Sequence, residues 1–336
     1  MAKTGTSKPT LVSLARELGV SRQTVSNALN APEVVRPDTR ERVLAAIRES
    51  GYRPSAVGRA LRTRRSMNLA FRLYPAAADG MNGAVMDRFL HNLVVEAQRH
   101  GYRVVLFDSD SYSDEVHALH EQHQAGVIDA CVLINSHSGD ARPARLREFG
   151  LPTVVFGRPW DDLSAPHAWL DIDGSAGCAE AVRHLREAGH TRIGFLGWPE
   201  GSGAGDDRYS GWLRGMAGLD VSGLRVAADD GVQHGAAAAE DLLARGATAI
   251  VCASDSLALG AASRWRAAGM PPGTVIGFDD TPVAVALGMS SVAQPVEQAA
   301  VALVALALAE LHGRPAERHQ LLPSHLVVRT PATFTN

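Results

Sequence analysis

Short apolar runs alternate with helical patterns along most of this chain, and this alternation restricts the fold more than any other feature. From residue 67 onward, eight runs have the length and composition of buried strands. They are NLAFRLY, RVVLFD, DACVLIN, PTVVFG, AWLDID, RIGFLGW, AIVCAS and TVIGFDD. Helical patterns lie near 83–100, 113–125, 174–189, 206–219, 234–245 and 255–268. The alternation predicts parallel sheets covered by helices, and eight strands over this length predict two sheets.

Composition indicates a globular protein of a reducing compartment. The 336 residues are enough for two or three domains, and 46% are hydrophobic. Cys131, Cys178 and Cys252 are far apart in apolar runs, so we expect buried free thiols. The apolar run at 299–309 is shorter than the ~20 residues of a membrane span and is expected to form a buried helix. The first ten residues lack the apolar core of a secretory signal, so we expect a cytoplasmic protein with no membrane contact.

Charge is divided unevenly along the chain. Residues 1–66 hold 13 of the 33 Lys and Arg residues and 5 of the 36 Asp and Glu residues, a net charge of +8. The remaining residues hold 20 positive and 31 negative side chains, a net charge of −11. This asymmetry predicts a basic module for a polyanion, attached to an acidic body.

Residues 10–51 carry the pattern of three short helices around a small core. Thr10 is the expected N-cap of the first helix, whose apolar positions follow an i, i+3, i+4, i+7 spacing, and Gly19 is its expected end. Ser21 is the expected N-cap of the second helix, and the third is expected to begin at Pro37. Two helices joined by a tight glycine turn predict a helix-turn-helix module.

The second of these helices is expected to present a polar outer face. Its outward side chains are Arg22, Gln23, Ser26 and Asn27. Arginine contacts guanine bidentately, and glutamine or asparagine does the same to adenine, so these residue types suit the reading of bases. Hydroxyl groups of Ser21, Thr24 and Ser26 suit phosphate oxygens, which fix the register of a protein on DNA.

The N-terminal residues resemble the headpiece and hinge of LacI/GalR-type transcriptional regulators. The resemblance rests on TLVSLARELGVSRQTVSNALN, VVRPDTRERVLAAIRESGYRPS and GRALRTRRS, which occur in the expected order. It implies a headpiece over 1–51, with its second helix in the DNA major groove, and a hinge over 52–66 that inserts Leu61 into the minor groove. The implied DNA-contacting residues are Thr10, Ser21, Arg22, Gln23, Thr24, Ser26, Asn27, Arg36, Tyr52, Ser55, Arg59 and Leu61. Departures from the family pattern fall at Asn27, Arg36, Ser55 and Gly58. They concern the operator sequence and hinge folding rather than the fold.

The rest of the chain resembles the core of the same family, and so the periplasmic sugar-binding fold. Matching pieces include VRHLREAGHTRIGFLG, DDRYSGWLRGM, ASDSLALGAASRWRAAG and TVIGFDDTPVAVAL. The resemblance implies two doubly wound parallel-sheet subdomains, with chain crossings near Pro166–Asp171, Val292–Gln294 and His325–Leu326. The expected subdomains are 67–168 with 293–325, and 169–292 with 326–336.

A ligand cleft is expected between these subdomains, at the carboxyl ends of the strands. By resemblance, the cleft residues are Tyr74, Asn135, Trp169, Trp198, Arg208, Asp255, Asp279 and Gln294, together with Arg158 after the fourth strand. Vicinal sugar hydroxyls suit carboxylates and a guanidinium, and sugar C–H faces suit tryptophan. Two alternatives stay open: Asp173 and Asp255 also precede helices and suit N-caps, and Trp212 suits a core better than a ligand platform.

Two local features bear on the size of the ligand. Many family members have Asp where Gly157 stands, so one polar contact is absent here. The loop WPEGSGAGDDR, 198–208, is long and rich in glycine. Together these features favour an oligosaccharide or glycoside over a single purine.

Competing classes have weaker support. Gly201–Gly205 follows a strand and precedes a helix, which would suit a nucleotide- or NAD-binding enzyme, but its G-x-G-x-G spacing is not the dinucleotide fingerprint. His117, His120 and His123 are spaced along a helix without an accompanying cysteine or carboxylate cluster, and we expect a solvated face rather than a metal site. A periplasmic solute-binding protein would have no DNA-binding module.

The sequence therefore predicts a ligand-responsive transcriptional regulator, without catalytic residues or a cofactor. The favoured function is repression of a carbohydrate-use operon by a homodimer on palindromic DNA. No leucine-heptad tail follows the last strand, which favours a dimer over a tetramer. A purine-responsive regulator is the alternative within the same family.

Overall fold

The chain divides into a small unit, Met1–Arg65, and a large one, Ser66–Asn336. The computed structural model describes residues 9–52, 65–74 and 82–330. Ser55, Gly58, Arg59 and Leu61 of the predicted hinge therefore lie outside the described residues.

The small unit is a helical module with the predicted caps. Its helices are α1 (Leu11–Leu18), α2 (Arg22–Asn30), the 3₁₀ turn η1 (Pro32–Val34) and α3 (Pro37–Ser50). Thr10 and Ser13 form a capping box at the start of α1, and Ser21 accepts a hydrogen bond from the Thr24 amide at the start of α2. Gly19 ends α1 with a left-handed φ of 64°, which glycine adopts without a Cβ penalty. The buried core residues are Leu14, Ala15, Val25, Ala28, Val43 and Ala46.

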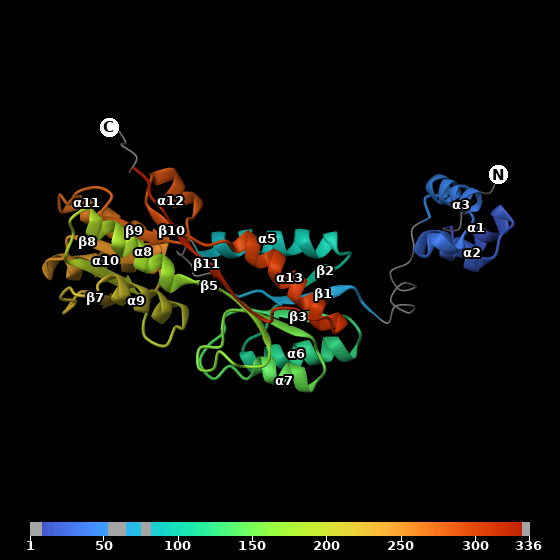
Figure 1. Cartoon of the computed structure of the whole chain (residues 1–336), viewed down its shortest axis with the longest axis horizontal. Helices are drawn as coiled ribbons and strands as arrows, with labels where there is room; N and C mark the ends of the chain where they lie inside the picture. The colour runs from blue at the N-terminus through green and yellow to red at the C-terminus, as the bar shows by residue number, and fades with distance from the viewer. Residues whose placement is uncertain (1–8, 53–64, 75–81, 331–336) are drawn as a thin grey trace, which may run out of the picture. The chain divides into compact units, whose positions relative to one another are not determined.

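The large unit contains two six-stranded sheets, which confirms the predicted α/β fold (Figure 1). The first has the order β11-β5-β4-β3-β1-β2 and the second β12-β10-β9-β8-β6-β7. The first sheet comprises β1 (Asn68–Arg72), β2 (Arg103–Phe107), β3 (Ala130–Leu133), β4 (Thr153–Phe156), β5 (Ala168–Asp173) and β11 (His319–Pro323). The second comprises β6 (Ile193–Gly197), β7 (Arg225–Ala227), β8 (Ala249–Cys252), β9 (Val275–Phe278), β10 (Ser291–Ala293) and β12 (His325–Val327). Neighbouring strands run parallel except for the antiparallel pair β10–β12.

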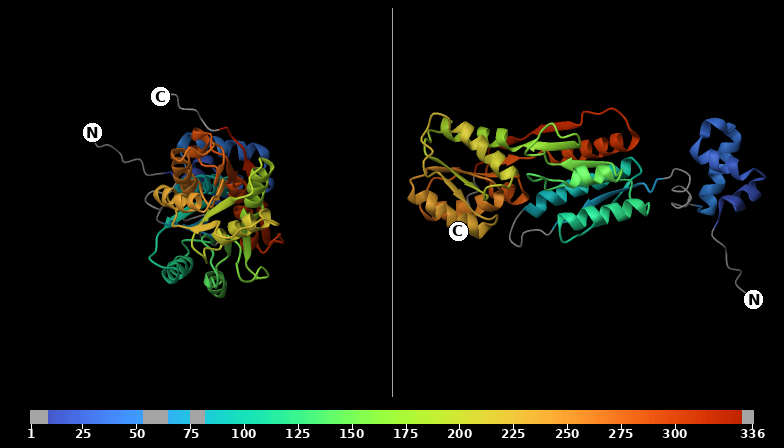
Figure 2. Two further views of the ribbon diagram at one scale, coloured as in Figure 1. Left: turned by 90° about the vertical axis from the view of Figure 1, so that its left-hand side faces the viewer. Right: turned by 90° about the horizontal axis from the view of Figure 1, so that it is seen from below.

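Helices cover both faces of each sheet, as the two views in Figure 2 show. They are α5 (Asn82–Arg99), α6 (Tyr112–Gln124), α7 (Arg142–Glu148), α8 (Gly174–Glu187), α9 (Ala204–Gly215), α10 (Val232–Ala244), α11 (Asp255–Ala267), α12 (Pro282–Leu287) and α13 (Val296–His312). α13 contains the predicted buried helix and packs with α5 on the first sheet. No helix in the described part of the chain is long and apolar enough to cross a membrane.

All eight predicted strands are present, but β7, β10, β11 and β12 were missed. β7, β10 and β12 have three residues each, too few to show a periodic pattern. β11, HQLLP, is a sheet-edge strand with no fully buried side chain: three are half-buried, and Leu321 and Pro323 are exposed. Short edge strands carry little hydrophobic signal because one side of them is not packed.

The chain crosses between the two sheets three times, and the first crossing differs from the prediction. β5 pairs with β4 and β11 in the first sheet, and its pairing with β11 continues to Asp173. The expected boundary at 168 is therefore wrong, since residues 169–173 belong to the first sheet. Ser324 lies between β11 and β12, and its hydroxyl donates to the Asp173 carbonyl at 2.6 Å. Two of the crossings are thus hydrogen-bonded to each other.

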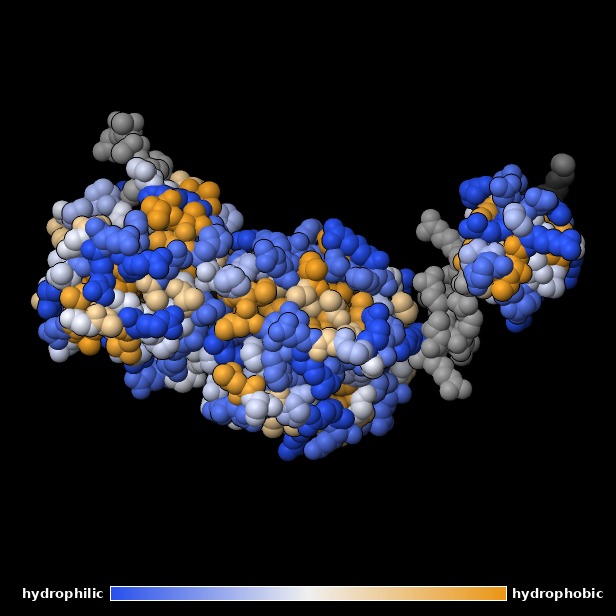
Figure 3. Space-filling model, in the orientation of Figure 1, coloured by the Kyte–Doolittle hydropathy of each residue, from blue (hydrophilic) through white to orange (hydrophobic). Residues whose placement is uncertain are grey.

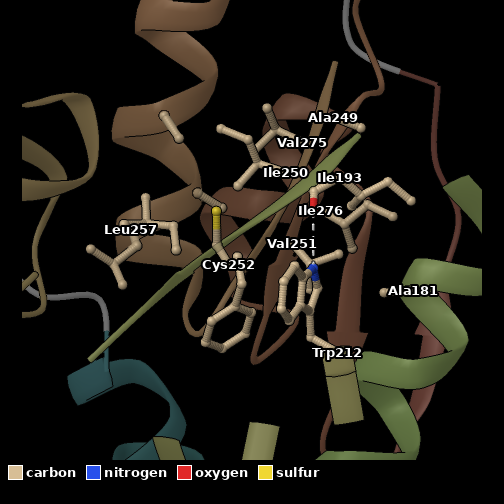
Figure 4. Close-up of a cluster of buried hydrophobic side chains, with 14 of the residues drawn as sticks. Ala181, Ile193, Trp212, Ala249, Ile250, Val251, Cys252, Leu257, Val275 and Ile276 are labelled. Atoms are coloured by element: carbon tan, nitrogen blue, oxygen red, sulfur yellow. Dashed lines mark hydrogen bonds between the residues drawn. The ribbon is translucent and has the colours of Figure 1, made fainter. Parts of the chain in front are cut away.

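The core of the second sheet contains Trp212, as expected for a packing residue. Its side chain is fully buried, and its Nε1 donates to the Ile193 carbonyl at 3.2 Å (Figure 4). Cys252 lies in the same cluster, and all three cysteines are buried and free. Burial raises the pKa of the Cys131 and Cys178 thiols to about 12, so both stay protonated at neutral pH.

Candidate functional site

A cavity of about 540 Å³ lies at the carboxyl ends of strands from both sheets. This volume is within the ~300–1,000 Å³ range of small-molecule sites. Predicted residues that line it are Asn135, Trp198, Arg208, Asp279 and Gln294. The first sheet supplies Asn135 after β3, while the second sheet and α9 supply Trp198, Asp279 and Arg208. A ligand in this cavity would contact both subdomains.

Arg208 is held at the cavity between two aromatic rings. It lies on the first turns of α9, which begin after the glycine loop that contributes Gly201 and Ser202 to the cavity wall. The centre of its guanidinium lies 3.7 Å from the ring centroid of Phe278 and 4.9 Å from that of Trp198. It also donates a hydrogen bond to the Ala253 carbonyl. Stacking and the carbonyl contact fix the plane of the guanidinium, so its orientation is set before a ligand binds.

Asp279 is a buried carboxyl group with an incomplete set of partners. Its Oδ1 accepts a hydrogen bond of 2.6 Å from Gln294 and lies 3.9 Å from Nη2 of Arg208. Its Oδ2 has no hydrogen-bond partner among the described residues. Burial raises the pKa of Asp279 to about 8, although the cation of Arg208 acts in the opposite direction. A ligand hydroxyl is one group that can complete its hydrogen bonding.

Asp255 does not line the cavity, so its predicted ligand contact is wrong. The side chain is fully buried, and it accepts hydrogen bonds from the Thr281 amide at 2.7 Å, the Thr281 hydroxyl at 2.8 Å and the Ser291 hydroxyl at 2.6 Å. The N-cap of α11 is Ser254, so the alternative role also fails. Burial raises the pKa of Asp255 to about 6. Its carboxyl group fastens the turn between β9 and α12, next to Asp279.

Asp173 caps a helix, which is the structural alternative to a ligand contact. It is the N-cap of α8, and its Oδ1 accepts a hydrogen bond of 2.8 Å from the Ala176 amide. The residue on β5 that reaches the cavity is Asp171, which the sequence did not single out. The sequence marks Asp171 only as a polar residue near the carboxyl end of a strand, and Asp173 fits that description better because it lies nearer to the end.

Tyr74 and Trp169 were also expected in the cleft, and neither lines the cavity. The hydroxyl of Tyr74 donates to Glu115 at 3.1 Å and accepts from Arg142 at 2.9 Å, and burial raises the pKa of Tyr74 to about 12. Trp169 is 7% exposed and stacks on His319 of β11 at 5.1 Å. It lies near the start of β5, whereas the cavity lies at the carboxyl ends of the strands, so Trp169 and the cavity are separated along the strand.

Arg158 lies beside the cavity and connects the two subdomains rather than lining it. Its Nε donates to Asp171 at 2.6 Å, and its Nη1 lies 3.5 Å from Oδ1 of Asp207 on α9. Burial raises the pKa of Asp207, and Arg158 acts against that shift. Arg158 and Asp207 therefore form an ion pair across the boundary between the first and second subdomains.

The outer face of α2 has the polar character that was predicted. Arg22 and Gln23 are exposed, and Thr24, Ser26 and Asn27 are half-buried. Nε2 of Gln23 donates to Oδ1 of Asn27 at 2.8 Å, so these two amides are oriented together. Arg36 is exposed before α3, while Tyr52 is half-buried and packs against the small core.

The three spaced histidines have protein partners. His117 pairs with Glu121 at 3.4 Å, the His120 ring packs against Phe149 in a tilted arrangement with 3.8 Å between the ring centroids, and Nδ1 of His123 lies 3.4 Å from the Ile128 carbonyl. His120 and His123 are half-buried, so the helix face is less solvated than expected. Within the described ranges, no group of three or more His, Cys, Asp or Glu side chains is placed to hold a metal ion.

Comparison with known proteins finds two matching family models. Residues 10–55 match bacterial regulatory proteins of the lacI family, and residues 182–330 match a periplasmic binding protein-like domain. The chain is 32% identical over 338 residues to the HTH-type transcriptional regulator CelR of Thermobifida fusca, covering 96% of this chain and 98% of CelR. It is also 32% identical to the HTH-type transcriptional regulator MalR of Streptomyces coelicolor, covering 95% of each.

Solved structures give the same result. A complex of the transcriptional regulator CelR with cellobiose matches with a TM-score of 0.70 and 30% identity, over 96% of this chain and all of that one. The lac repressor dimer bound to operator and an anti-inducer matches with a TM-score of 0.80 over 97% and 99% of the two chains. At 23% identity, this second likeness establishes a shared fold.

Proposed function

The chain belongs to the lacI family of bacterial regulatory proteins, and we propose that it is a repressor of carbohydrate-use genes whose effector is a sugar or glycoside. It is a helix-turn-helix transcriptional regulator with a periplasmic binding protein-like core, and not an enzyme. The protein would act in the cytoplasm, where chromosomal DNA lies.

The arrangement around Arg208 carries the sugar proposal. A planar guanidinium, the buried carboxyl of Asp279 and the amide of Gln294 converge on one cavity, next to the face of Trp198. Such a set binds vicinal hydroxyls with the polar groups and a C–H face of the sugar ring with the indole. The cellobiose complex of CelR, a relative with the same fold, supports this choice over a purine.

The DNA proposal rests on the outer face of α2. Arg22, Gln23 and Asn27 are residue types that read base edges, and Ser21 and Thr24 suit phosphates. A palindromic operator would need two copies of the chain. Figure 3 shows apolar surface over α12, where Val283 and Val285 are 37% and 52% exposed. A patch of this kind supports contact with another protein surface, such as a second subunit.

Regulation would follow from the position of the cavity. A saccharide that contacts both Asn135 and Arg208 bridges the two subdomains, so its affinity depends on their relative arrangement. A ligand shifts such an equilibrium by its difference in affinity for the two states. The hinge between core and headpiece, including Leu61, would then transmit the change to DNA binding. Whether the effector releases the operator or strengthens binding depends on which state it prefers.

A thermal-shift screen followed by a gel shift tests the proposal. The full chain is screened against cellobiose, maltose, their longer homologues, hypoxanthine and guanine. We expect a disaccharide or a longer saccharide to raise the melting temperature, and the same saccharide to change retention of promoter DNA that the protein binds. Stabilisation by a purine, with no response to any saccharide, would contradict the sugar proposal and support the purine alternative.

A further inference from the structure

Trp160 lies in a loop of the first subdomain after β4 and lines the effector cavity. Its side chain lines the cavity of about 540 Å³ and also a second cavity of about 200 Å³. Ser136 and His137 line both cavities too. The indole therefore stands at the junction of two spaces. The smaller space is below the ~300 Å³ of an ordinary ligand site, so it suits an extension of the larger cavity better than a separate site.

The indole of Trp160 has two contacts within the first subdomain. Its Nε1 donates a hydrogen bond of 3.1 Å to the Ser136 carbonyl. The guanidinium of Arg158 lies 5.0 Å from its ring centroid. The hydroxyl of Ser136 in turn donates to the Arg158 carbonyl at 3.0 Å, which ties the loop to the end of β3. A side chain fixed in this way behaves as a wall rather than as a flexible cover.

Across the cleft, the same indole packs against Gly203 of the second subdomain. A Cβ atom at Gly203 would lie 2.5 Å from Nε1 of Trp160 and 2.6 Å from the neighbouring ring carbon. Gly203 also has a φ of 57° and precedes α9, the helix that carries Arg208. The absence of a side chain at this position is therefore what allows the indole to meet the opposite wall.

The smaller cavity has a lining that suits a further sugar unit. Pro143, Val155 and Pro166 supply apolar surface, while Arg147 and His167 supply groups that can bind hydroxyls. A few polar groups on a mainly apolar wall are typical of small-molecule sites. Trp160 is one of three residues that line both this cavity and the effector cavity.

We propose that Trp160, seated on Gly203, closes one end of the effector cavity and thereby sets the length of the saccharide that binds. The inference rests on the proposed sugar function and names the residue that determines specificity within it. A longer saccharide would have to displace the indole of Trp160. The indole would then lose its hydrogen bond to Ser136 and its contact with Gly203. Steric exclusion of this kind discriminates against the longer ligand without adding a contact to the shorter one.

Calorimetric titration of the full chain tests this role with defined probes. The probes are cellobiose, cellotriose and cellotetraose, and maltose, maltotriose and maltotetraose. Wild type is expected to bind one chain length best and to lose at least about tenfold in affinity for the next longer homologue. Trp160→Ala is expected to reduce that ratio by about tenfold or to reverse it. Trp160→Leu keeps an apolar wall but shortens it, and should shift the ratio in the same direction even if the alanine variant folds poorly.

Two further variants test whether Trp160 limits the length of the ligand or only stabilises the structure. Gly203→Ala places a methyl group against the indole and should weaken binding of the preferred saccharide, with no gain for longer ones. Leu163→Ala, in the same loop at a 57% exposed position, is the control and should leave the affinities unchanged. Equal loss at every chain length in the Trp160 variants, with the wild-type ratio preserved, would overturn the inference while leaving the sugar function intact. Absence of saccharide binding in wild type would instead overturn the proposed function, and this inference with it.

Discussion

Nη2 of Arg208 lies 3.9 Å from Oδ1 of Asp279, at the edge of ion-pair distance and beyond hydrogen-bond distance. Both side chains are buried, and Oδ1 of Asp279 takes its hydrogen bond from Gln294 instead. The guanidinium and the carboxyl group thus both line the cavity, close together but not hydrogen-bonded to each other. A ligand with adjacent hydroxyl groups can bridge them, which gives this pair the character of a binding site rather than of a structural ion pair.

Replacing Arg208 with lysine should weaken effector binding by about tenfold or more while DNA binding persists. Lysine keeps the charge but has neither the planar fork nor the ability to stack between Phe278 and Trp198. Calorimetric titration with the saccharide identified in the screen measures the loss, and a gel shift without effector measures DNA binding. A lysine variant with wild-type saccharide affinity would contradict the placement of the effector at Arg208.

Stability should fall as pH rises from about 6 to 8, because of Asp279. Its pKa is raised to about 8 in the folded chain and is ~3.9 in the unfolded chain, so the folded state binds the additional proton. The resulting stabilisation is complete below about pH 4 and is lost as pH rises through 8. Asp255, with a pKa of about 6, adds to the fall only up to that pH. Loss from Asp279 can reach ~1.4 kcal/mol per pH unit.

Urea unfolding of Asp279→Asn between pH 6 and 8.5 tests this assignment. Asparagine does not titrate, so the free energy of unfolding should change less with pH than in wild type. Asp220→Asn is the matched control, because hydrogen bonds from Ser222 lower the pKa of Asp220 and its titration lies outside this range. A variant at 279 that retains the full wild-type slope would show that another group titrates.

Asn27→Ala should change the base preference at one operator position and cost about 1–3 kcal/mol of specific DNA binding. The alanine removes a base-reading amide and also releases Gln23, which donates to Asn27 at 2.8 Å. Selection from a randomised DNA library, followed by gel shifts on the selected sites, measures both effects. A uniform loss on all sequences would indicate that Asn27 serves a phosphate contact instead.

Thr10→Ala should lower the local stability of α1 by about 0.5–2 kcal/mol, since the Thr10 side chain caps the Ser13 amide at 3.1 Å. Faster amide exchange confined to the small unit is the expected readout. Thr10→Ser retains the hydroxyl and should restore wild-type exchange. If the serine variant exchanges as fast as the alanine variant, the capping hydroxyl is not what stabilises α1.

The helical module could be predicted nearly to the residue because its signals are local. Thr10, Ser21 and Gly19 act on backbone groups three or four residues away, so a cap or a left-handed turn can be identified without knowing the tertiary fold. The eight strands of the large unit were equally visible, because a fully buried strand leaves a continuous apolar run. Short segments such as β10 and α12 gave no such pattern.

The cleft was predicted less completely because side-chain position depends on distant segments. Asp255 and Asp279 are both acidic residues near strand ends, yet only the second lines the cavity. Thr281 and Ser291, which lie further along the chain, donate hydrogen bonds to the carboxyl group of Asp255 and hold it away from the cavity. Trp169 was misplaced for a similar reason, since its position along β5 and its stacking partner His319 are fixed by sheet pairing.

Sequence alone is enough to predict the helix-turn-helix module, the alternation of strands and helices, and the residue types available for a ligand. Those properties depend on backbone capping and on periodic burial, which act over a few residues. Tertiary packing, by contrast, sets which polar side chains reach the cavity and brings Trp160 against Gly203 across it. Those relationships join segments tens of residues apart, and the packing of two sheets, rather than any local preference, brings them together.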